Sequence, residues 1–85
     1  MSAAVPAPSA WYLTQTEAAV FAARGDHCDV RGCREPVRAV THRWFTRDAA
    51  IRLAEHLVCA GHGEAFARRH HIDIAAPPAG APDER

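Results

Sequence analysis

The residues best suited to chemistry are three cysteines and one histidine, which form two closely spaced pairs. Cys28 and Cys33 have four residues between them, whereas Cys59 and His62 have two. Thiolate sulfur and imidazole nitrogen are ligands that zinc prefers, and structural zinc sites use four of them in a tetrahedron. Two close pairs separated by a long insert are typical of such sites. The sequence therefore predicts one structural zinc ion bound by Cys28, Cys33, Cys59 and His62.

Another histidine offers an alternative fourth ligand. His27 adjoins Cys28 in the sequence and could replace His62. We favour His62, because two ligands three residues apart on the first turn of a helix, as Cys59 and His62 would be, can point at one ion. The competing interpretation is three unrelated buried cysteines and a stray histidine. The remaining histidines are expected to face solvent or to support the ligands: His42, His56, His70 and His71.

A catalytic zinc site is an alternative use of the same residues. His62-Gly63-Glu64 reproduces the His-x-Glu element of zinc deaminases. Those enzymes also need a following Pro-Cys-x-x-Cys motif, which this sequence lacks. A catalytic zinc also keeps one coordination position open for water, and four protein ligands would close it. We therefore predict a structural metal, no catalytic residues and no enzyme activity.

The length and composition of the chain favour a fold held by a metal. The chain has 85 residues, and segments 1–10 and 75–85 are rich in proline and alanine. Such segments have little to bury, so we expect flexible tails on either side of one domain over residues 11–74. A domain of that size rarely folds on apolar burial alone and normally needs a disulfide or a metal.

Cysteine number and charge indicate the environment of the protein. Three cysteines is an odd number, and the N-terminus lacks the pattern of a secretion signal, so we expect a reducing cytoplasm. No apolar run approaches the roughly 18 residues of a membrane span, so we expect no membrane association. The formal net charge is zero, which argues against a general polyanion-binding protein.

An N-terminal helix is predicted over residues 15–24. Thr14 and Glu17 form a capping-box pattern, in which each side chain accepts a hydrogen bond from the backbone amide of the other residue. Gly25 is placed to end the helix. A similar opening occurs in helix-turn-helix DNA-binding proteins, but here Cys28 follows where their second helix would begin. We therefore do not predict a helix-turn-helix.

The insert between the ligand pairs must leave Cys33 and return to Cys59. Residues 37–45 are rich in β-branched and aromatic residues and predict a strand, with a turn over 46–48. Residues 49–58 fit either a second strand or an amphipathic helix after Asp48, and propensity favours the helix, which would make the fold mostly α. A hairpin with two similar arms returns Cys59 to Cys33 without another connection. We therefore predict the hairpin and an α+β fold.

A second helix is predicted from Ala60 to about His71. Cys59 and His62 then lie at its first turn, where the positive end of the helix dipole stabilises a thiolate. The order of parts is a loop with two cysteines, a β-hairpin and a helix whose first turn carries the second ligand pair. Over residues 26–72 this order resembles the treble-clef group of zinc fingers.

The resemblance implies a fold and a structural metal, with the ligands Cys28, Cys33, Cys59 and His62. Two features depart from the usual pattern of the group. The usual loop has two residues between its cysteines where this chain has four, and many members have a cysteine at the position of His62. Members of the group bind nucleic acid, proteins or lipids, so the resemblance implies no particular partner.

Arginine residues and an aromatic ring gather on the predicted hairpin. Guanidinium groups beside a stacking surface are typical of nucleic-acid interfaces. Six acidic residues between positions 26 and 64 offset this charge, so nucleic-acid binding is the alternative function. The residues of this candidate surface are Arg38, Arg43, Trp44, Arg47 and Arg52.

We favour protein interaction, with the chain acting as an accessory or regulatory protein. A closed metal site gives no catalysis, and zero net charge gives little electrostatic steering. A domain this small also exposes part of its apolar surface, which partners can cover. The aromatic side chains most suited to meet an unidentified protein partner are Trp11, Tyr12, Trp44 and Phe45.

Overall fold

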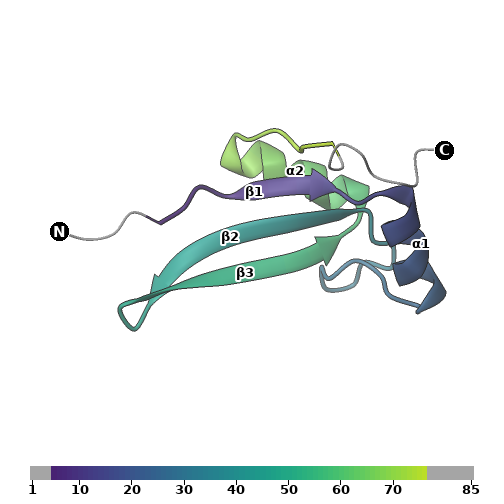
Figure 1. Ribbon diagram of the computed structural model, residues 1–85, viewed down its shortest axis with the longest axis horizontal. Helices are drawn as coiled ribbons and strands as arrows, with labels where there is room; N and C mark the ends of the chain where they lie inside the picture. The colour runs from purple at the N-terminus through teal and green to yellow at the C-terminus, as the bar shows by residue number, and fades with distance from the viewer. Residues whose placement is uncertain (1–4, 77–85) are drawn as a thin grey trace.

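The chain folds as a small α+β domain in this computed structural model, which describes residues 5–76. Three strands and two helices follow one another in the order β1, α1, β2, β3 and α2 (Figure 1). The bounds are Ser9–Tyr12 for β1, Gln15–Ala23 for α1, Ala39–Arg47 for β2, Ala50–Val58 for β3 and Ala60–His70 for α2. The predicted α+β class is confirmed, and the mostly α alternative is wrong.

Strands β2 and β3 form the predicted hairpin. Each strand has nine residues, and the two pair antiparallel over their full length. Asp48 and Ala49 make the turn with positive φ angles of 55° and 63°. Positive φ at both positions is typical of the two-residue turn whose twist matches that of the flanking strands. The turn therefore lies at Asp48 and Ala49, slightly later than the predicted 46–48.

Residues 50–58 form a strand although their propensity favours a helix. Each residue of β3 has a partner on β2, from Ala50 opposite Arg47 to Val58 opposite Ala39. Pairing along a neighbouring strand outweighs the small free-energy differences between intrinsic propensities. As a result Cys59 returns to the end of the sheet from which β2 begins.

Strand β1 was not predicted and extends the sheet to the order β1-β2-β3. Ser9 and Ala10, placed in the N-terminal tail by the sequence, belong to this strand, and Ala10 is buried. The Ala75 amide donates a hydrogen bond to the Ala10 carbonyl at 2.9 Å, and the Ala75 carbonyl accepts one from the Tyr12 amide at 3.0 Å. The described structure therefore extends past both predicted domain boundaries. Residues 1–4 and 77–85 of the predicted tails lie outside the described residues.

Helix α1 begins with the predicted capping box. The Thr14 hydroxyl accepts from the Glu17 amide at 3.1 Å, and the Glu17 carboxylate accepts from the Thr14 amide at 2.9 Å. The helix ends at Ala23, and Gly25 follows with a φ of 81°. These local hydrogen bonds hold a helix of which no residue is buried.

Helix α2 begins after Cys59, which is its N-cap residue, and ends at His70. His71 follows in the left-handed region, with a φ of 57°. The predicted helix is thus confirmed to within one residue. Within the described part of the chain, neither helix is long and apolar enough to cross a membrane.

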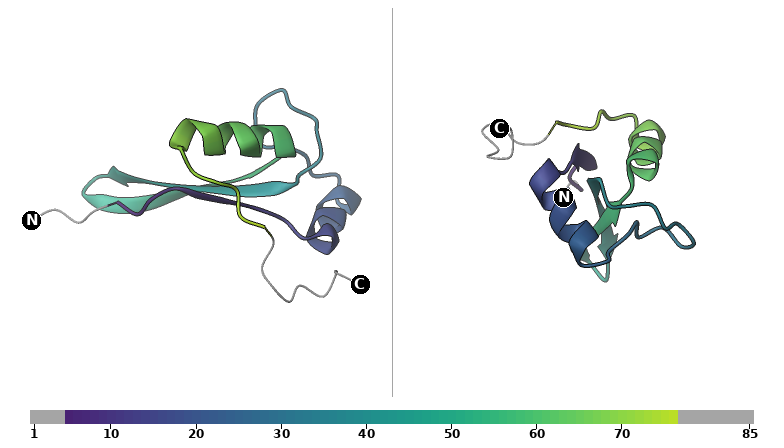
Figure 2. Two further views of the ribbon diagram at one scale, coloured as in Figure 1. Left: turned by 90° about the horizontal axis from the view of Figure 1, so that it is seen from above. Right: turned by 90° about the vertical axis from the view of Figure 1, so that its right-hand side faces the viewer.

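The core lies at one end of the sheet. Helix α2 crosses one face there, and α1 lies beyond the end of the strands (Figures 1 and 2). The helix lies against the sheet at Gly63, where a Cβ atom would lie 3.0 Å from the Ala39 Cβ. Ala39 and Val58 are buried against Cys28 and Cys59. Helix, hairpin and candidate ligands therefore share one core.

Among residues 5–76, no helix crosses the distal part of the opposite face of the sheet (Figure 2). Strand register places Trp11, His42, Trp44, Ile51 and Leu53 on it. The His42 ring packs edge-on with the two indoles, at centroid distances of 4.6 Å to Trp11 and 5.5 Å to Trp44. Ile51 and Leu53 are 43% and 45% exposed. We call the surface formed by these five residues the uncovered face.

Candidate metal centre

The four predicted ligand residues lie together in the core. A ligand atom from each lies within 4.8 Å of the other three. His62 Nδ1 is 3.3 Å from Cys28 Sγ and from Cys59 Sγ, and Cys33 Sγ is 3.9 Å from Cys59 Sγ. Zinc bonds of about 2.3 Å to sulfur and about 2.0 Å to nitrogen would place tetrahedral neighbours about 3.8 Å apart for two sulfurs and about 3.5 Å apart for sulfur and nitrogen. These three distances are therefore close to those between ligands of a tetrahedral zinc ion.

Backbone hydrogen bonds shape the loop between the first two cysteines. The Cys28 amide donates to the Glu35 carbonyl at 2.9 Å, and the Cys33 amide donates to the Val30 carbonyl at 2.9 Å. Gly32 has a φ of 84°, which a residue with a side chain rarely adopts. The four intervening residues thus form a closed turn that brings the second sulfur back beside the first.

Asp29 fastens this loop to the edge of β3. Its amide donates to the Leu57 carbonyl at 2.8 Å, and its carboxylate accepts from the Leu57 amide at 2.9 Å. Leu57 is two residues from Cys59, so this double contact aligns the two ligand pairs. Sequence reasoning did not identify Asp29, because nothing next to Cys28 in the sequence indicates a partner on a distant strand.

The second ligand pair is positioned by the first turn of α2. The Cys59 sulfur accepts a hydrogen bond from the His62 amide at 3.4 Å. Burial raises the pKa of Cys59, but hydrogen bonds from the His62 amide, from the Cys28 and Cys33 thiols and from the Gly61 amide lower the pKa by more. The helix start therefore favours the thiolate, which is the form that binds metal.

The pKa of Cys33 is shifted in the other direction. A hydrogen bond from the Glu35 amide lowers this pKa, but desolvation and the neighbouring Cys28 and Cys59 thiols raise it by more. Thiolates this close repel one another, so they do not ionise together without a compensating charge. A bound cation supplies that charge and allows all three sulfurs to ionise. The electrostatics of the cluster therefore favour a metal ion.

The other histidines of the described chain lie outside the cluster. His27 is exposed, and its Nδ1 lies 3.2 Å from the carbonyl oxygen of Cys28. The structure thus favours His62 over His27 as the fourth ligand. His71 follows the last residue of α2, and three others have side-chain partners: His42 pairs with Glu55, His56 with Asp29, and His70 packs on Phe66.

Glu64, the glutamate of the His-x-Glu pattern, contacts β1 instead of the ligands. Its carboxylate accepts a hydrogen bond from the Tyr12 hydroxyl at 3.1 Å. This hydrogen bond raises the pKa of Tyr12 above its usual value, with smaller contributions from burial and from the carboxylate charge. Glu64 therefore joins α2 to the sheet.

The predicted partner surface is divided between the two faces of the sheet. Register places Arg43, Arg47 and Arg52 on the face that α2 partly covers, whereas Trp44 lies on the uncovered face. Arg38 is exposed just before β2. The five predicted residues therefore do not form one patch.

The aromatic residues suspected of partner contact divide in the same way. Trp11 and Trp44 are on the uncovered face, and Tyr12 and Phe45 are on the other. Phe66 was not among the predicted surface residues, and it lies on α2 beside the arginine-bearing face of the sheet. The spacing of Phe66, Arg69 and His70 by three and four residues would have placed them on one side of a helix.

Comparison of the chain with protein-family models, with curated proteins and with solved structures gives no match.

Proposed function

We propose that the protein is a small module whose fold is held by one zinc ion, as in the treble-clef zinc fingers that its sequence resembles. The observation that carries this proposal is the cluster of three sulfurs and one nitrogen at tetrahedral spacing. Cys28 and Cys59 are only 2% and 7% exposed and pack with Ala39 and Val58. Because the ligands are themselves the core, the domain has few other contacts to hold loop, sheet and helix together.

The zinc in this proposal is structural, and the module is not an enzyme. Thiolate-rich tetrahedral sites favour zinc over harder cations such as magnesium. Four protein atoms complete the coordination and leave no position at which water is activated. The nearest candidate base in the sequence, Glu64, is hydrogen-bonded to Tyr12 on β1, which supports the same conclusion.

Native mass spectrometry of the purified chain tests metal identity and stoichiometry together. We expect one zinc ion per chain, removed by a strong chelator. His62→Ala should weaken zinc binding by at least about tenfold, because it removes one of four bonds. His27→Ala is the matched control and should bind zinc as the wild type does. Unchanged zinc affinity of His62→Ala, or a loss in His27→Ala, would contradict the ligand set.

We further propose that the module acts by binding a protein partner through the uncovered face. Leu53 lies directly opposite Trp44 on the neighbouring strand, and Ile51 continues the apolar surface toward the hairpin turn. Indole rings and aliphatic side chains contribute strongly to binding when a partner removes them from water. The His42–Glu55 pair, at 2.9 Å, adds a polar group within this surface that a partner can recognise.

A capture experiment with two neighbouring variants tests this surface. Leu53→Glu places a charge on the uncovered face, whereas Arg52→Glu places the same side chain one residue away on the opposite face. A protein captured by the wild type and by Arg52→Glu should be lost with Leu53→Glu. Equal capture by all three chains, after zinc content has been matched, would contradict the proposed surface.

A further inference from the structure

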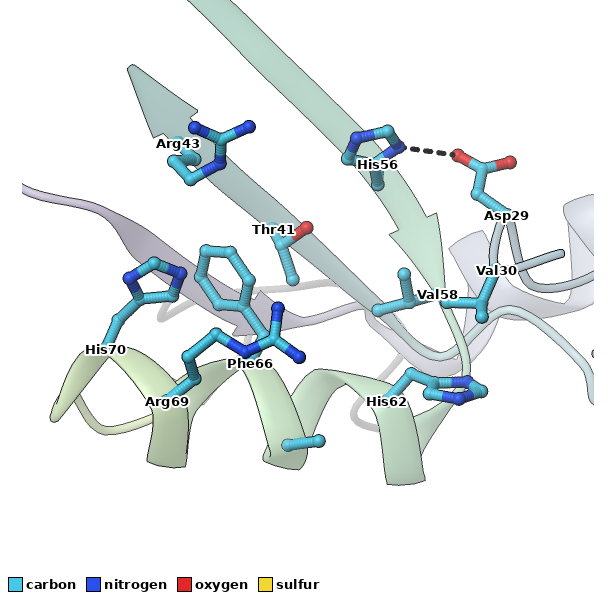
Figure 3. Close-up of a pocket in the computed structure, with 11 residues that line it drawn as sticks. Asp29, Val30, Thr41, Arg43, His56, Val58, His62, Phe66, Arg69 and His70 are labelled. Carbon is cyan, nitrogen blue, oxygen red and sulfur yellow. Dashed lines mark ion pairs between the residues drawn. The ribbon is translucent and has the colours of Figure 1, made fainter. Parts of the chain in front are cut away.

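A groove runs between α2 and the face of the sheet that α2 partly covers (Figure 3). It has a volume of about 510 Å³. Arg43 and Thr41 line it from β2, whereas Phe66, Arg69 and His70 line it from α2. Figure 3 shows these side chains approaching the same space from two walls. The groove is separate from the uncovered face and lies beside the metal cluster.

The groove is positively charged although the chain is neutral overall. Its two guanidinium groups come from opposite walls, and no carboxylate of residues 5–76 forms an ion pair with either Arg43 or Arg69. Asp29 is the one carboxylate among the residues that line the groove. It accepts a hydrogen bond from the Leu57 amide and lies 3.7 Å from the His56 ring nitrogen. A concave site lined by cations without carboxylate partners concentrates anions.

Two carboxylates that could neutralise the groove lie elsewhere. The Glu64 carboxylate accepts a hydrogen bond from the Tyr12 hydroxyl. Together with Arg68, Glu64 lines a different depression on the other side of α2. Glu55 pairs with His42 on the opposite face of the sheet. The separation of these charges is a property of the fold, and the net charge of the sequence does not reveal it.

Aromatic rings alternate with the cations along the same surface. The Phe66 and His70 rings lie with centroids 4.4 Å apart on the helix wall. On the sheet, the Arg43 guanidinium lies 5.6 Å from the centre of the Phe45 ring. Register also places Arg52 opposite Phe45, on the same face. Guanidinium groups interleaved with flat rings suit a ligand that has both phosphates and bases.

We propose that this groove binds single-stranded nucleic acid, with Arg43 and Arg69 contacting phosphates and Phe66 stacking on a base. A duplex keeps its bases stacked inside, where a ring on a groove wall does not reach their faces. An acidic peptide would satisfy the guanidinium groups but offers no base to the rings. This inference goes beyond the zinc-held module and uses the opposite face of the sheet from the proposed protein surface.

Fluorescence anisotropy with a labelled oligothymidine of about 12 nucleotides tests the groove in the zinc-loaded full chain. We expect saturable binding that weakens steeply between roughly 50 mM and 150 mM salt. Arg43→Gln and Arg69→Ala should each weaken binding about tenfold and make the salt slope shallower by about 0.7. Phe66→Leu, which keeps an apolar side chain, should weaken binding about fivefold through lost stacking.

Arg68→Ala is the matched control, because it removes the same charge from the neighbouring residue of α2 outside the groove. It should bind the strand within about twofold of the wild type. Zinc content and circular dichroism are measured for each variant, so the zinc-held module is tested separately from the groove.

Four results would overturn the proposal. The first is no binding by folded, zinc-loaded protein at about 100 µM, and the second is an equal loss of affinity in Arg68→Ala and Arg69→Ala. The third is a duplex that binds as tightly as the single strand. The fourth is displacement of the strand by polyglutamate as readily as by unlabelled oligothymidine.

Discussion

The two ends of the β2–β3 hairpin contrast sharply although the same two strands build them. At the metal end, Ala39 is 0% exposed and its partner Val58 is 5% exposed. Near the turn, Ile51 and Leu53 are 43% and 45% exposed. The metal end is covered by α2 and by the cysteine loop, whereas within residues 5–76 the strand ends near the turn are exposed.

This difference indicates where a chain of 85 residues obtains its stability. Apolar burial is concentrated within a short distance of the four candidate ligands. The distal half of the hairpin depends on that end to stay folded, because an isolated two-stranded hairpin is only marginally stable in water. Changes at the metal end should therefore affect the whole domain, and changes near the turn should have small effects on stability.

Removal of the metal should have the largest effect. Zinc contributes an apparent free energy of about 10 to 16 kcal/mol to folding in comparable small modules, which equals or exceeds the total stability of a typical small domain. We therefore expect Cys28→Ala, or chelation of the wild type, to abolish the cooperative thermal transition measured by circular dichroism. If the metal-free chain keeps its circular dichroism spectrum and its melting temperature, neither end of the hairpin depends on the ion for its stability.

Overpacking of the α2–sheet contact should have the next largest effect. A Cβ at Gly63 would lie 3.0 Å from Ala39 Cβ and 3.6 Å from Val58 Cγ2, whereas one at Gly61 would meet no atom within 4 Å. Gly63→Leu should therefore lower the free energy of unfolding by about 1 to 3 kcal/mol. Gly61→Leu, on the exposed side of the same helix, is the control and should be neutral or slightly stabilising. Chemical denaturation of the zinc-loaded variants measures both, and equal effects would contradict the close contact.

The features predicted from the sequence were those that depend on short stretches of chain. The ligand spacings, the capping box of Thr14 and Glu17, and the need for the hairpin to return Cys59 to Cys33 are local or follow from chain connectivity. The structure confirms the hairpin and the positions of both helices.

Features that depend on distant partners were not predicted. β1 has only four residues and gains its hydrogen bonds from β2, about 30 positions away, so its own sequence has no distinct pattern. The contact of Asp29 with Leu57 is likewise invisible before the strands are placed. The pairing register decides that Trp44 and Arg43 lie on opposite faces, and a shift by one residue would have exchanged those faces.

A change in the turn should stabilise the distal end. Ala49 has a φ of 63°, a conformation that costs a residue with a Cβ atom roughly 1 to 2 kcal/mol. Glycine relieves this strain but loses more conformational entropy on folding, so Ala49→Gly should stabilise the zinc-loaded protein by about 0.5 to 1 kcal/mol. Ala50→Gly, the same substitution one residue later in β3, should destabilise by a similar amount. Thermal melts that shift in the same direction for both variants would contradict the turn geometry.

Substitution on the uncovered face should have the smallest effect on stability. Leu53 is 45% exposed and has Trp44 as its direct cross-strand neighbour, so Leu53→Thr should change the free energy of unfolding by no more than about 0.5 kcal/mol. Threonine keeps a high strand propensity, which isolates the loss of apolar surface from any change in backbone preference. Denaturation at two protein concentrations measures the effect and detects self-association. A loss above about 2 kcal/mol, greater at the higher concentration, would show that a second copy covers this face in solution. Self-association would then stabilise the distal end of the hairpin. The difference in burial between the two ends would apply only to the isolated chain.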